Sequence, residues 1–349
     1  MRINFVLPRT INKPMGGYRV VYQYAKRLAE DGNDVHIFFL IHDHKFSLKT
    51  IIRKIDGLTF HRKKYRYISW FDLRKVRLHF DQTLEDIAAI SQGKIIATHW
   101  STARVVCESQ CKPKDKFYLI QDYEIFDPFV TKKELENTWK LPLKKIMVSK
   151  WLIRKGAELG INPCSMFYVP NFINTSEFPI KRDNCDRNIV SFLWHNNPRK
   201  QSQMGIKIVS KLKLKYPKLR FIMFGVNITD FPKNVEIIEN ANVQQLNYIY
   251  RHSIVYFMPS SKEGWGLTGM EAMACGAAVA TIDNGGIWEY ANENSAVIVR
   301  NNKRKLFCAI VKLIEDKKYR EKIVKKAYYN VEHFTFNNSY HKFLLALYS

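Results

Sequence analysis

Long apolar runs are scarce in this chain of 349 residues. A membrane-spanning helix needs roughly 18 consecutive apolar residues, whereas the longest runs here are of the kind found at residues 35–41. The N-terminal stretch MRINFVLP is too short in its apolar part for a secretory signal, and no small-residue cleavage site follows it. We therefore predict a cytoplasmic protein without a transmembrane segment.

Cysteine motifs and the common cofactor-binding loops are lacking as well. The six cysteines, at positions 107, 111, 164, 185, 275 and 308, form no C-x-x-C pair and have no metal-knuckle spacing. We expect them to be reduced, and we expect neither a metal site nor a cofactor. Neither a G-x-G-x-x-G fingerprint nor a P-loop is present, which disfavours a nicotinamide-dependent or ATP-dependent enzyme.

Acidic residues are outnumbered by basic ones. Lys and Arg total 56 against 32 Asp and Glu, which gives a formal net charge of +24. Such a charge favours anionic partners, namely nucleic acid, an acidic membrane surface or a polyanionic substrate. A genome rich in A and T would also raise the use of Lys without any binding role. Composition alone leaves both explanations open.

The basic residues are concentrated at residues 45–80. This segment holds eleven Lys and Arg against two Asp, interleaved with aromatic residues that include Phe46, Phe60, Tyr65, Tyr67, Trp70 and Phe71. Basic side chains are attracted to an anionic leaflet, and aromatic side chains favour the membrane interface. We therefore predict peripheral attachment to the inner face of the cell membrane through this segment.

Short β-rich runs alternate with helical patterns along the chain, which is typical of parallel α/β architecture. The length favours two domains. We predict two Rossmann-like, doubly wound domains at residues 1–173 and 174–335, with a polar linker over 174–188 and a cleft between the carboxyl ends of the two sheets. The amphipathic stretch 336–349 can dock on either domain, including back on the first. The predicted strands are residues 3–7, 35–41, 94–98, 117–121, 145–148, 166–169, 189–194, 219–224, 235–238, 254–258 and 278–282.

The loop that follows the predicted strand 254–258 has the strongest chemical pattern. Its glycines, Gly264 and Gly266, allow a ligand to approach the backbone closely. The next three residues, Leu267 to Gly269, would present N–H groups at the positive end of a helix, which suits an anion such as phosphate. Glu271 lies about one turn inside that helix, where it can reach two vicinal hydroxyls of a ribose or simply compensate the helix dipole. Glu263, taken alone, can also be explained as a loop residue whose side chain lies in solvent.

Two further loops place phosphate-binding chemistry after predicted strands. Gly16 and Gly17 begin a helix after the first strand, so their amides can meet a phosphate, although such glycines also occur for purely conformational reasons. Arg199 and Lys200 lie at a predicted helix N-terminus, where a cation is misplaced unless an anion compensates it. A diphosphate would supply that anion, and a solvated surface pair is the alternative.

The strands 94–98 and 117–121 are followed by polar residues that would share one sheet edge. His99 can donate a proton or a hydrogen bond near neutral pH, or it can cap the helix that follows. Asp122 and Glu124 can orient acceptor hydroxyls, or they can cap the segment after them.

These residues resemble the retaining, GT-B-fold glycosyltransferases of family four. The segment from Pro259 to Gly276, PSSKEGWGLTGMEAMACG, is similar to the family signature, with Glu263 and Glu271 in its E-x7-E arrangement. Similarities elsewhere cover most of the chain, including the glycines at 16–17, residues 169–171 and the Gly-Gly at 285–286. The run Gln121-Asp122-x-Glu124 is similar to that of some bacterial polysaccharide rhamnosyltransferases.

The resemblance implies a nucleotide-diphosphate sugar held by the second domain, with UDP, dTDP and GDP left open. It also implies an acceptor facing the first domain, and transfer with retention and without a required metal. Glu271 would bind the ribose, and Glu263 the donor sugar. His99 would act near the reacting carbon, with Asp122 and Glu124 on the acceptor side. The diphosphate would contact Gly16, Gly17, Arg199, Lys200, Gly266, Leu267 and Thr268.

One position departs from the family pattern, which places an arginine five residues before its lysine. If Trp194 takes the place of the arginine, Arg199 takes that of the lysine; if His195 does, Lys200 does. The implied acceptor is a hydroxyl of a lipid-linked or cell-surface glycan.

Two kinds of rival remain. Another GT-B enzyme, such as a nucleotide-sugar epimerase or a sugar phosphorylase, would share the donor loop. A basic nucleic-acid-binding protein would share the charge and the aromatic residues but would leave the loop from Glu263 to Gly276 unexplained, and we expect no nucleic-acid partner.

Overall fold

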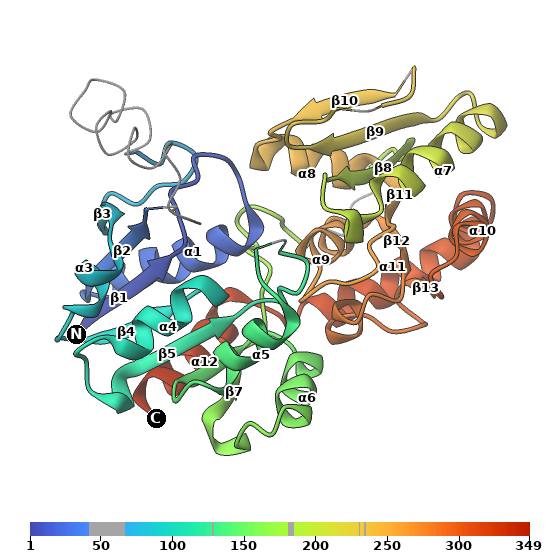
Figure 1. The fold of residues 1–349 in the computed structure, drawn as a ribbon. Helices are drawn as coiled ribbons and strands as arrows, with labels where there is room; N and C mark the ends of the chain where they lie inside the picture. Colours follow the sequence, from blue (N-terminus) through green and yellow to red (C-terminus); the bar gives the residue numbers. More distant parts are fainter. Residues whose placement is uncertain (42–66, 128, 181–184, 230, 234) are drawn as a thin grey trace. The chain divides into compact units, whose positions relative to one another are not determined.

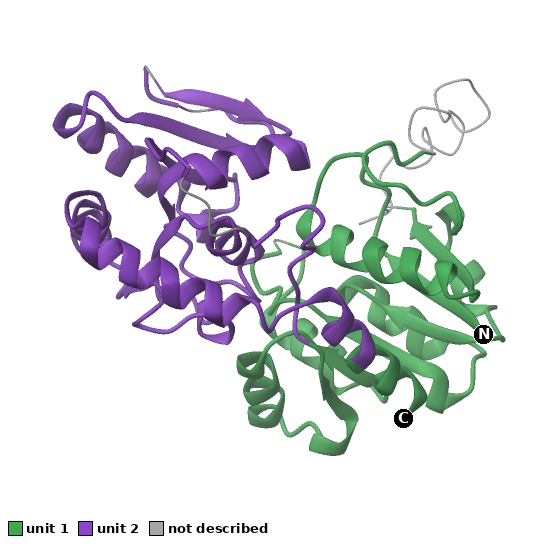
Figure 2. Ribbon diagram, turned by 180° about the vertical axis from the view of Figure 1, so that it is seen from behind, with its two compact units in different colours: residues 1–169, 342–349 green, residues 170–341 purple. Residues whose placement is uncertain are grey.

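The computed structural model describes residues 1–41, 67–127, 129–180, 185–229, 231–233 and 235–349. The chain divides into two compact units, coloured separately in Figure 2. Unit 1 comprises Met1–Val169 and Lys342–Ser349, and unit 2 comprises Pro170–His341. Each unit contains one parallel sheet with helices packed on it.

Unit 1 is built on a seven-stranded sheet among its described residues, with the order β3-β2-β1-β4-β5-β6-β7 (Figure 1). Every pairing in it is parallel. Its strands are β1 (Arg2–Leu7), β2 (Asp34–Leu40), β3 (Arg77–Gln82), β4 (Lys94–Ala97), β5 (Lys116–Ile120), β6 (Lys144–Met147) and β7 (Met166–Tyr168). Its helices are α1 (Gly16–Glu30), α3 (Leu84–Ala88), α4 (Trp100–Glu108), η2 (Pro113–Asp115), α5 (Lys132–Lys140), α6 (Lys150–Glu158) and η3 (Pro163–Ser165).

Unit 2 has a six-stranded sheet within its described part, with the order β10-β9-β8-β11-β12-β13 and parallel pairings throughout (Figure 1). Its strands are β8 (Ile189–Trp194), β9 (Arg220–Gly225), β10 (Glu236–Glu239), β11 (Ser253–Met258), β12 (Ala278–Ile282) and β13 (Val297–Val299). Its helices are η4 (Pro198–Lys200), α7 (Ser202–Lys215), α8 (Val243–His252), α9 (Leu267–Ala274), η5 (Gly286–Glu289), α10 (Lys303–Glu315) and α11 (Lys317–Val331). The last helix, α12 (Phe336–Tyr348), has residues in both units.

The predicted α/β class with two doubly wound parallel sheets is confirmed. Strands β3 and β13 are the two that the sequence did not predict. Both lie at an edge of their sheet. An edge strand has a neighbouring strand on one side only, so fewer of its side chains need to be apolar. No residue of β3 is fully buried, and β13 is three residues long, so neither produces the apolar run by which a buried strand is recognised.

Helix α1 shows how the local sequence sets the packing. Its apolar positions, among them Val21, Tyr24 and Leu28, are buried, and the chain turns away at Gly32, which has the positive φ of +84° expected after a helix C-terminus. The Tyr24 ring stacks on Phe343 of α12 at a centroid distance of 4.3 Å. The C-terminal part of α12 therefore contributes to the core of unit 1.

Part of the predicted membrane segment, residues 45–66, lies outside the described residues. Two of its aromatic residues, Trp70 and Phe71, contact Tyr22 of α1 with ring centroids 5.2 and 5.6 Å apart. The Trp70 indole donates to the Ile11 carbonyl. These two rings serve the packing of unit 1. Among the described residues, no helix combines the length and the apolar character that crossing a bilayer requires.

Two buried lysines cap helix C-termini in unit 1. The Lys116 ammonium donates to the carbonyls of Cys107 and Ser109 at the end of α4, each at 2.6 Å. The Lys145 ammonium donates to the Leu141 carbonyl beyond α5 at 2.7 Å. Cations at this end of a helix are favourable. Burial nevertheless lowers the pKa of Lys145 to about 8, although Cys107 acts in the opposite direction.

The lowered pKa of Lys145 predicts a pH dependence of stability. An unfolded lysine has a pKa of about 10.4, so between about pH 8 and pH 10 the unfolded chain binds more protons than the folded one. Stability gained from this residue therefore rises with pH in that window. We expect Lys145→Met to stabilise the protein most below pH 8, with the advantage shrinking toward pH 10. Urea unfolding across this pH range, with the exposed Lys133→Met as control, measures the difference. A constant difference would contradict the assignment.

Candidate functional site

Strand β11 leads directly into the loop with the strongest sequence pattern. Every residue of β11 is buried, and the loop ends at Gly266, which precedes α9 with a φ of +87°. This left-handed conformation favours glycine. The Tyr290 hydroxyl donates to the Gly266 carbonyl at 2.7 Å, and both groups are buried. Tyr290, the residue that follows η5, thus holds the start of α9 in place.

The first turn of α9 contains no acidic residue, so its positive end is not compensated from within the helix. The Gly269 amide donates to the Gly266 carbonyl at 3.0 Å. The prediction that Gly269 presents a free N–H group is therefore wrong, and the predicted anion contact rests on Leu267 and Thr268. A side chain at Gly269 would meet Met258 and the Tyr290 hydroxyl at 2.5 Å, which explains the glycine there as a packing requirement.

Glu263 and Lys200 form a buried ion pair between two loops. The Lys200 ammonium contacts both carboxylate oxygens of Glu263, at 2.6 and 2.8 Å. The side chains are 9% exposed for Glu263 and 17% for Lys200. Burial raises the pKa of the Glu263 carboxyl, but Lys200 and Arg199 more than offset it and hold that pKa below its ordinary value. Glu263 is therefore a carboxylate at neutral pH.

The loop of Glu263 is fixed on both sides by backbone contacts. The Glu263 amide donates to the Asn284 carbonyl at 2.9 Å, and Glu263 forms a parallel β-bridge with Gly285 after β12. On the other side, the Ser261 amide donates to the Arg199 carbonyl at 2.7 Å. Three loops, after β8, β11 and β12, are thereby joined at the carboxyl edge of the unit 2 sheet.

Arg199 and Lys200 lie on the short 3-10 helix η4. Gln201, with a φ of +49°, separates η4 from α7, so the two cations stand just before the α-helix whose N-terminus was predicted for them. Trp194 is 4% exposed and belongs to the core of the sheet. His195 lies in the loop, and its Nδ1 accepts a hydrogen bond from the Asn197 amide.

Glu271 lies inside α9, as predicted, and is 8% exposed. The Tyr250 hydroxyl donates to its Oε2 at 3.3 Å. Tyr250 comes from α8, so the orientation of Glu271 depends on a helix that precedes the loop in the chain.

In unit 1, Gly16 and Gly17 form the start of α1, as predicted. Met15 occupies the N-cap without a side-chain cap hydrogen bond, and the first turn holds no acidic residue. Gln121, immediately after β5, donates to the Gly17 carbonyl at 3.1 Å. The glycine turn therefore lies beside the Gln121-Asp122-x-Glu124 run. The Asp122 carboxylate accepts a hydrogen bond from the amide of the next residue, Tyr123.

His99 is the N-cap of α4, and Glu124 lies beside it. The His99 Nε2 is 3.5 Å from Glu124 Oε1 and 3.7 Å from Asp127 Oδ2. The same two carboxylates accept hydrogen bonds from the Trp100 amide, at 2.9 Å, and the Trp100 indole, at 2.8 Å. The interpretation of His99 as a helix cap is therefore confirmed. The same histidine also lies beside the acidic loop that follows β5.

The predicted residues fall into two groups, one in each unit. Unit 2 joins Glu263 with Lys200 and Arg199 and holds Glu271 on α9; unit 1 joins His99 with Glu124 and places Gly17 beside Gln121. A site that draws on both units stays a prediction. In the described part of the chain, no group of three or more His, Cys, Asp or Glu side chains is placed to hold a metal ion.

Sequence reasoning missed three residues that organise these groups: Asp127, Asn284 and Tyr290. Asp127 had a usable signal, since it follows Glu124 by three positions in a loop after a strand that neighbours β4. Asn284 likewise lies two residues after the end of β12. Tyr290 had no signal, because a buried tyrosine next to a glycine turn leaves no mark in the pattern of either segment.

A comparison with protein-family models gives a match within the second unit. Residues 174–329 match the family model described as "Glycosyl transferases group 1". A phosphatidyl-myo-inositol mannosyltransferase of Propionibacterium freudenreichii subsp. shermanii is 24% identical over 127 residues, which are 34% of this chain and 32% of that protein. The match therefore spans about a third of the length of this curated relative.

Solved structures resemble the whole chain. HepE of Anabaena, in complex with UDP and glucose, has a TM-score of 0.75 at 14% identity, with 99% of both chains covered. TarM of S. aureus, in a complex that includes UDP, has a TM-score of 0.71 at 11% identity with full coverage of both chains. Sucrose-phosphate synthase of Thermosynechococcus elongatus has a TM-score of 0.75 at 15% identity, covering 98% of this chain and 97% of its own. These likenesses establish the GT-B fold, and with the family model they support a glycosyltransferase.

The Glu263–Lys200 pair leads to a stability prediction. Removing one member of a buried ion pair leaves an uncompensated charge and costs about 3–5 kcal/mol. We expect Lys200→Met and Glu263→Gln each to destabilise the protein strongly, and the double variant to lose less than the sum. Urea unfolding of the four proteins measures this coupling. The exposed pair Lys215 and Glu315 provides matched control variants that should change little, and additive losses at Lys200 and Glu263 would contradict the pairing.

Proposed function

We propose that this protein is a retaining glycosyltransferase of family four that transfers a sugar from a nucleotide-diphosphate donor to a glycan hydroxyl. The single observation that carries the proposal is the buried Glu263–Lys200 pair placed beside the glycine-led start of α9. It combines a cation and helix-end amides for the two phosphates with a carboxylate for the sugar. The transferred sugar would be a hexose or a deoxyhexose.

The chemistry needs the leaving diphosphate to be stabilised more than any other group. Cleavage of the bond between sugar and phosphate forms an oxocarbenium-like sugar and an anion that gains charge. The amides of Leu267 and Thr268 and the positive end of α9 suit that anion. In a retaining transfer by same-face attack, the departing phosphate oxygen accepts the proton of the acceptor hydroxyl, so the enzyme needs neither a nucleophile nor a metal ion.

Lys200 is the better candidate for the cation that meets the phosphates. Trp194 is packed in the core, whereas His195 lies in the loop, and this favours the alignment that pairs His195 with Lys200. When a donor is bound, Glu263 can accept hydrogen bonds from sugar hydroxyls while Lys200 turns to the diphosphate. Glu271, steadied by Tyr250, would bind the ribose hydroxyls.

The acceptor is proposed to be a lipid-linked or cell-surface glycan, reached from the cytoplasmic face of the membrane. The net charge of +24 and the basic residues at 45–80 support this. On the acceptor side, His99, Asp122 and Glu124 belong to unit 1, together with the glycines at 16–17. HepE and TarM were each solved with UDP, which makes UDP-sugars the first donors to test.

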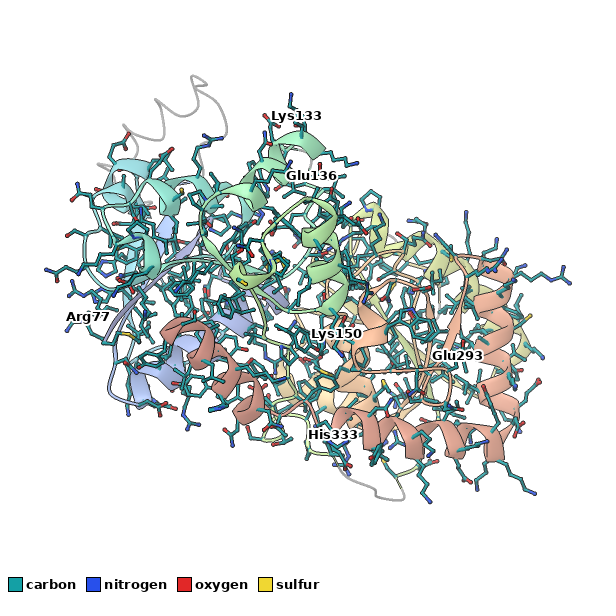
Figure 3. All side chains as sticks on the ribbon, turned by 90° about the horizontal axis from the view of Figure 1, so that it is seen from below. Arg77, Lys133, Glu136, Lys150, Glu293 and His333 are labelled. Atoms are coloured by element: carbon teal, nitrogen blue, oxygen red, sulfur yellow. The ribbon has the colours of Figure 1, made fainter. Side chains whose placement is uncertain are left out.

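Donor binding is tested by thermal shift with UDP-, dTDP- and GDP-sugars. A ligand at about 100 times its Kd should stabilise the protein by roughly 2.7 kcal/mol, and Glu271→Ala should remove most of that gain. Glu293→Ala is the matched control, because Glu293 is an exposed carboxylate of the same unit, in the loop before β13 (Figure 3). Equal stabilisation of Glu271→Ala and the parent protein would count against the proposed ribose contact.

Product analysis with the best donor separates the rival enzymes. A glycosyltransferase moves the sugar to an added acceptor, whereas an epimerase returns an isomerised nucleotide sugar and a phosphorylase needs inorganic phosphate. Stabilisation by nucleic acid without any response to nucleotide sugars would favour the binding-protein alternative.

Membrane attachment is tested by cosedimentation with vesicles that contain anionic lipid. We expect binding at low salt that weakens as salt rises, because each basic residue near such a surface contributes about 1 kcal/mol and the attraction is screened. Changing the basic residues Arg62, Lys63, Lys64 and Arg66 to Glu should reduce it strongly. Vesicle binding that stays the same at high salt and in the substituted protein would rule out this mode of attachment.

A further inference from the structure

Two histidine rings join the edge strand β3 to β2 in unit 1. The His36 Nδ1 and the His79 Nε2 are 2.8 Å apart. The two ring planes differ by only 8°, and the ring centroids are 5.1 Å apart. Nearly parallel rings with this distance between their nitrogens can share one hydrogen. The ring of Phe38 stacks on that of His79 at a centroid distance of 4.4 Å, which restricts the orientation of the histidine.

A carboxylate decides which ring donates the shared hydrogen. The His36 Nε2 faces the Asp34 Oδ1 at 3.0 Å. Hydrogen bonds from Arg2 and His36 hold the pKa of the Asp34 carboxyl at about 2, so it is an acceptor at neutral pH. The His36 Nε2 therefore carries a hydrogen, and the Nδ1 of the neutral ring is an acceptor. The hydrogen between the rings must come from the His79 Nε2, and the chain of donors runs from His79 through His36 to Asp34.

The charges around this chain of donors are mostly positive. Arg2, on β1, donates to the Asp34 Oδ2 at 2.9 Å, and an Arg77 nitrogen, on β3, is 3.2 Å from the Asp34 Oδ1. The cluster thus holds two permanent cations and one carboxylate before either ring is charged. Burial, together with the charges of His36, Arg77 and Arg2, lowers the pKa of His79. Protonation of the rings is therefore opposed in the folded strand.

Acid acts on the two rings in two steps. A first proton can bind the Nδ1 of His79, which leaves the shared hydrogen in place. A second proton needs the Nδ1 of His36, the atom that accepts that hydrogen, so two N–H groups would face each other at 2.8 Å. The doubly protonated cluster would also hold four cations around one carboxylate. Separation of the two rings removes both conflicts.

Strand β3 depends on β2 for its place in the sheet. It has no second neighbouring strand in the described part of the chain, and none of its residues is fully buried. Its register with β2 shifts between Phe38 and Leu40. An element with so few buried contacts opens locally at low cost. The loss of one side-chain hydrogen bond is therefore enough to change how often β3 opens.

We propose that His36 and His79 form a pH-sensitive latch, which fastens β3 to β2 while at most one of the two rings is charged and releases it when both are. Strand β3 contains the last residues of the basic, aromatic-rich segment 45–80. The latch thus controls how firmly the end of that segment is held on the sheet. It does not involve the donor chemistry proposed for unit 2.

Hydrogen exchange of the β3 amides, followed from about pH 8 to about pH 5 and corrected for the intrinsic pH dependence of exchange, tests the latch. In the open strand both rings are free to titrate near the ordinary histidine pKa of about 6.5, so the open state binds more protons than the closed one. Protection should therefore fall below that pH, by up to about tenfold per pH unit for each extra proton. His79→Gln keeps an N–H that can donate to His36 but takes up no proton. We expect this variant to lose most of the pH dependence.

His333→Gln is the matched control, because His333 is an exposed histidine of unit 2 (Figure 3) and its loss should leave the exchange of β3 as it is in the parent protein. A second measurement detects the shared hydrogen directly. In protein with nitrogen-15-labelled histidine, we expect a scalar coupling between one nitrogen of each ring at neutral pH, and its absence in His79→Gln. Protection of β3 that is constant with pH, a pH dependence that is kept in His79→Gln, or a parent protein without the coupling would overturn the latch.

Discussion

The ion pair of Glu263 and Lys200 is the interaction on which the organisation of unit 2 depends most directly. It joins the loop after β11 to the loop after β8 across 63 positions of the chain. Both groups are largely removed from water, where an unpaired charge is very costly. Neither residue can leave this arrangement without a replacement for its partner, and a ligand with two phosphates and a hydroxylated ring offers one to each of them. Under the proposed function, the pair would hold its two charges in place until a donor binds.

The backbone around the pair is held by contacts that leave little freedom. Tyr290 fixes the carbonyl of Gly266, Asn284 receives the amide of Glu263, and Ser261 is tied to Arg199. The residues joined in this way lie in the segments that follow three strands of the parallel sheet, β8, β11 and β12. Loops at the carboxyl edge of such a sheet are brought side by side by strand pairing. This explains how a binding site can be assembled from short segments without a continuous motif.

Unit 1 uses the same principle with different chemistry. The strands β4 and β5 are neighbours, so the loops that carry His99 and Glu124 meet at one edge. Trp100 then orders the acids with its backbone and indole donors. Unit 2 thus has cations and helix-end amides at its sheet edge, and unit 1 has a histidine and carboxylates at its own; under the proposed function the first group would serve the donor and the second would serve hydroxyl groups.

The amino-acid sequence by itself determined the fold class, most of the strands, the glycine-led start of α9 and the candidate residues, because these are properties of local pattern and spacing. Apolar periodicity predicts an element wherever burial is continuous, which is why the thinly covered edge strands β3 and β13 were missed. Only the tertiary structure decided that Lys200 pairs with Glu263, that Tyr290 holds Gly266 and that Asp127 stands beside His99. These partners lie 24 to 63 positions apart, and nothing in either local segment specifies the other. Strand order brings them together, and strand order is set by the packing of the whole sheet.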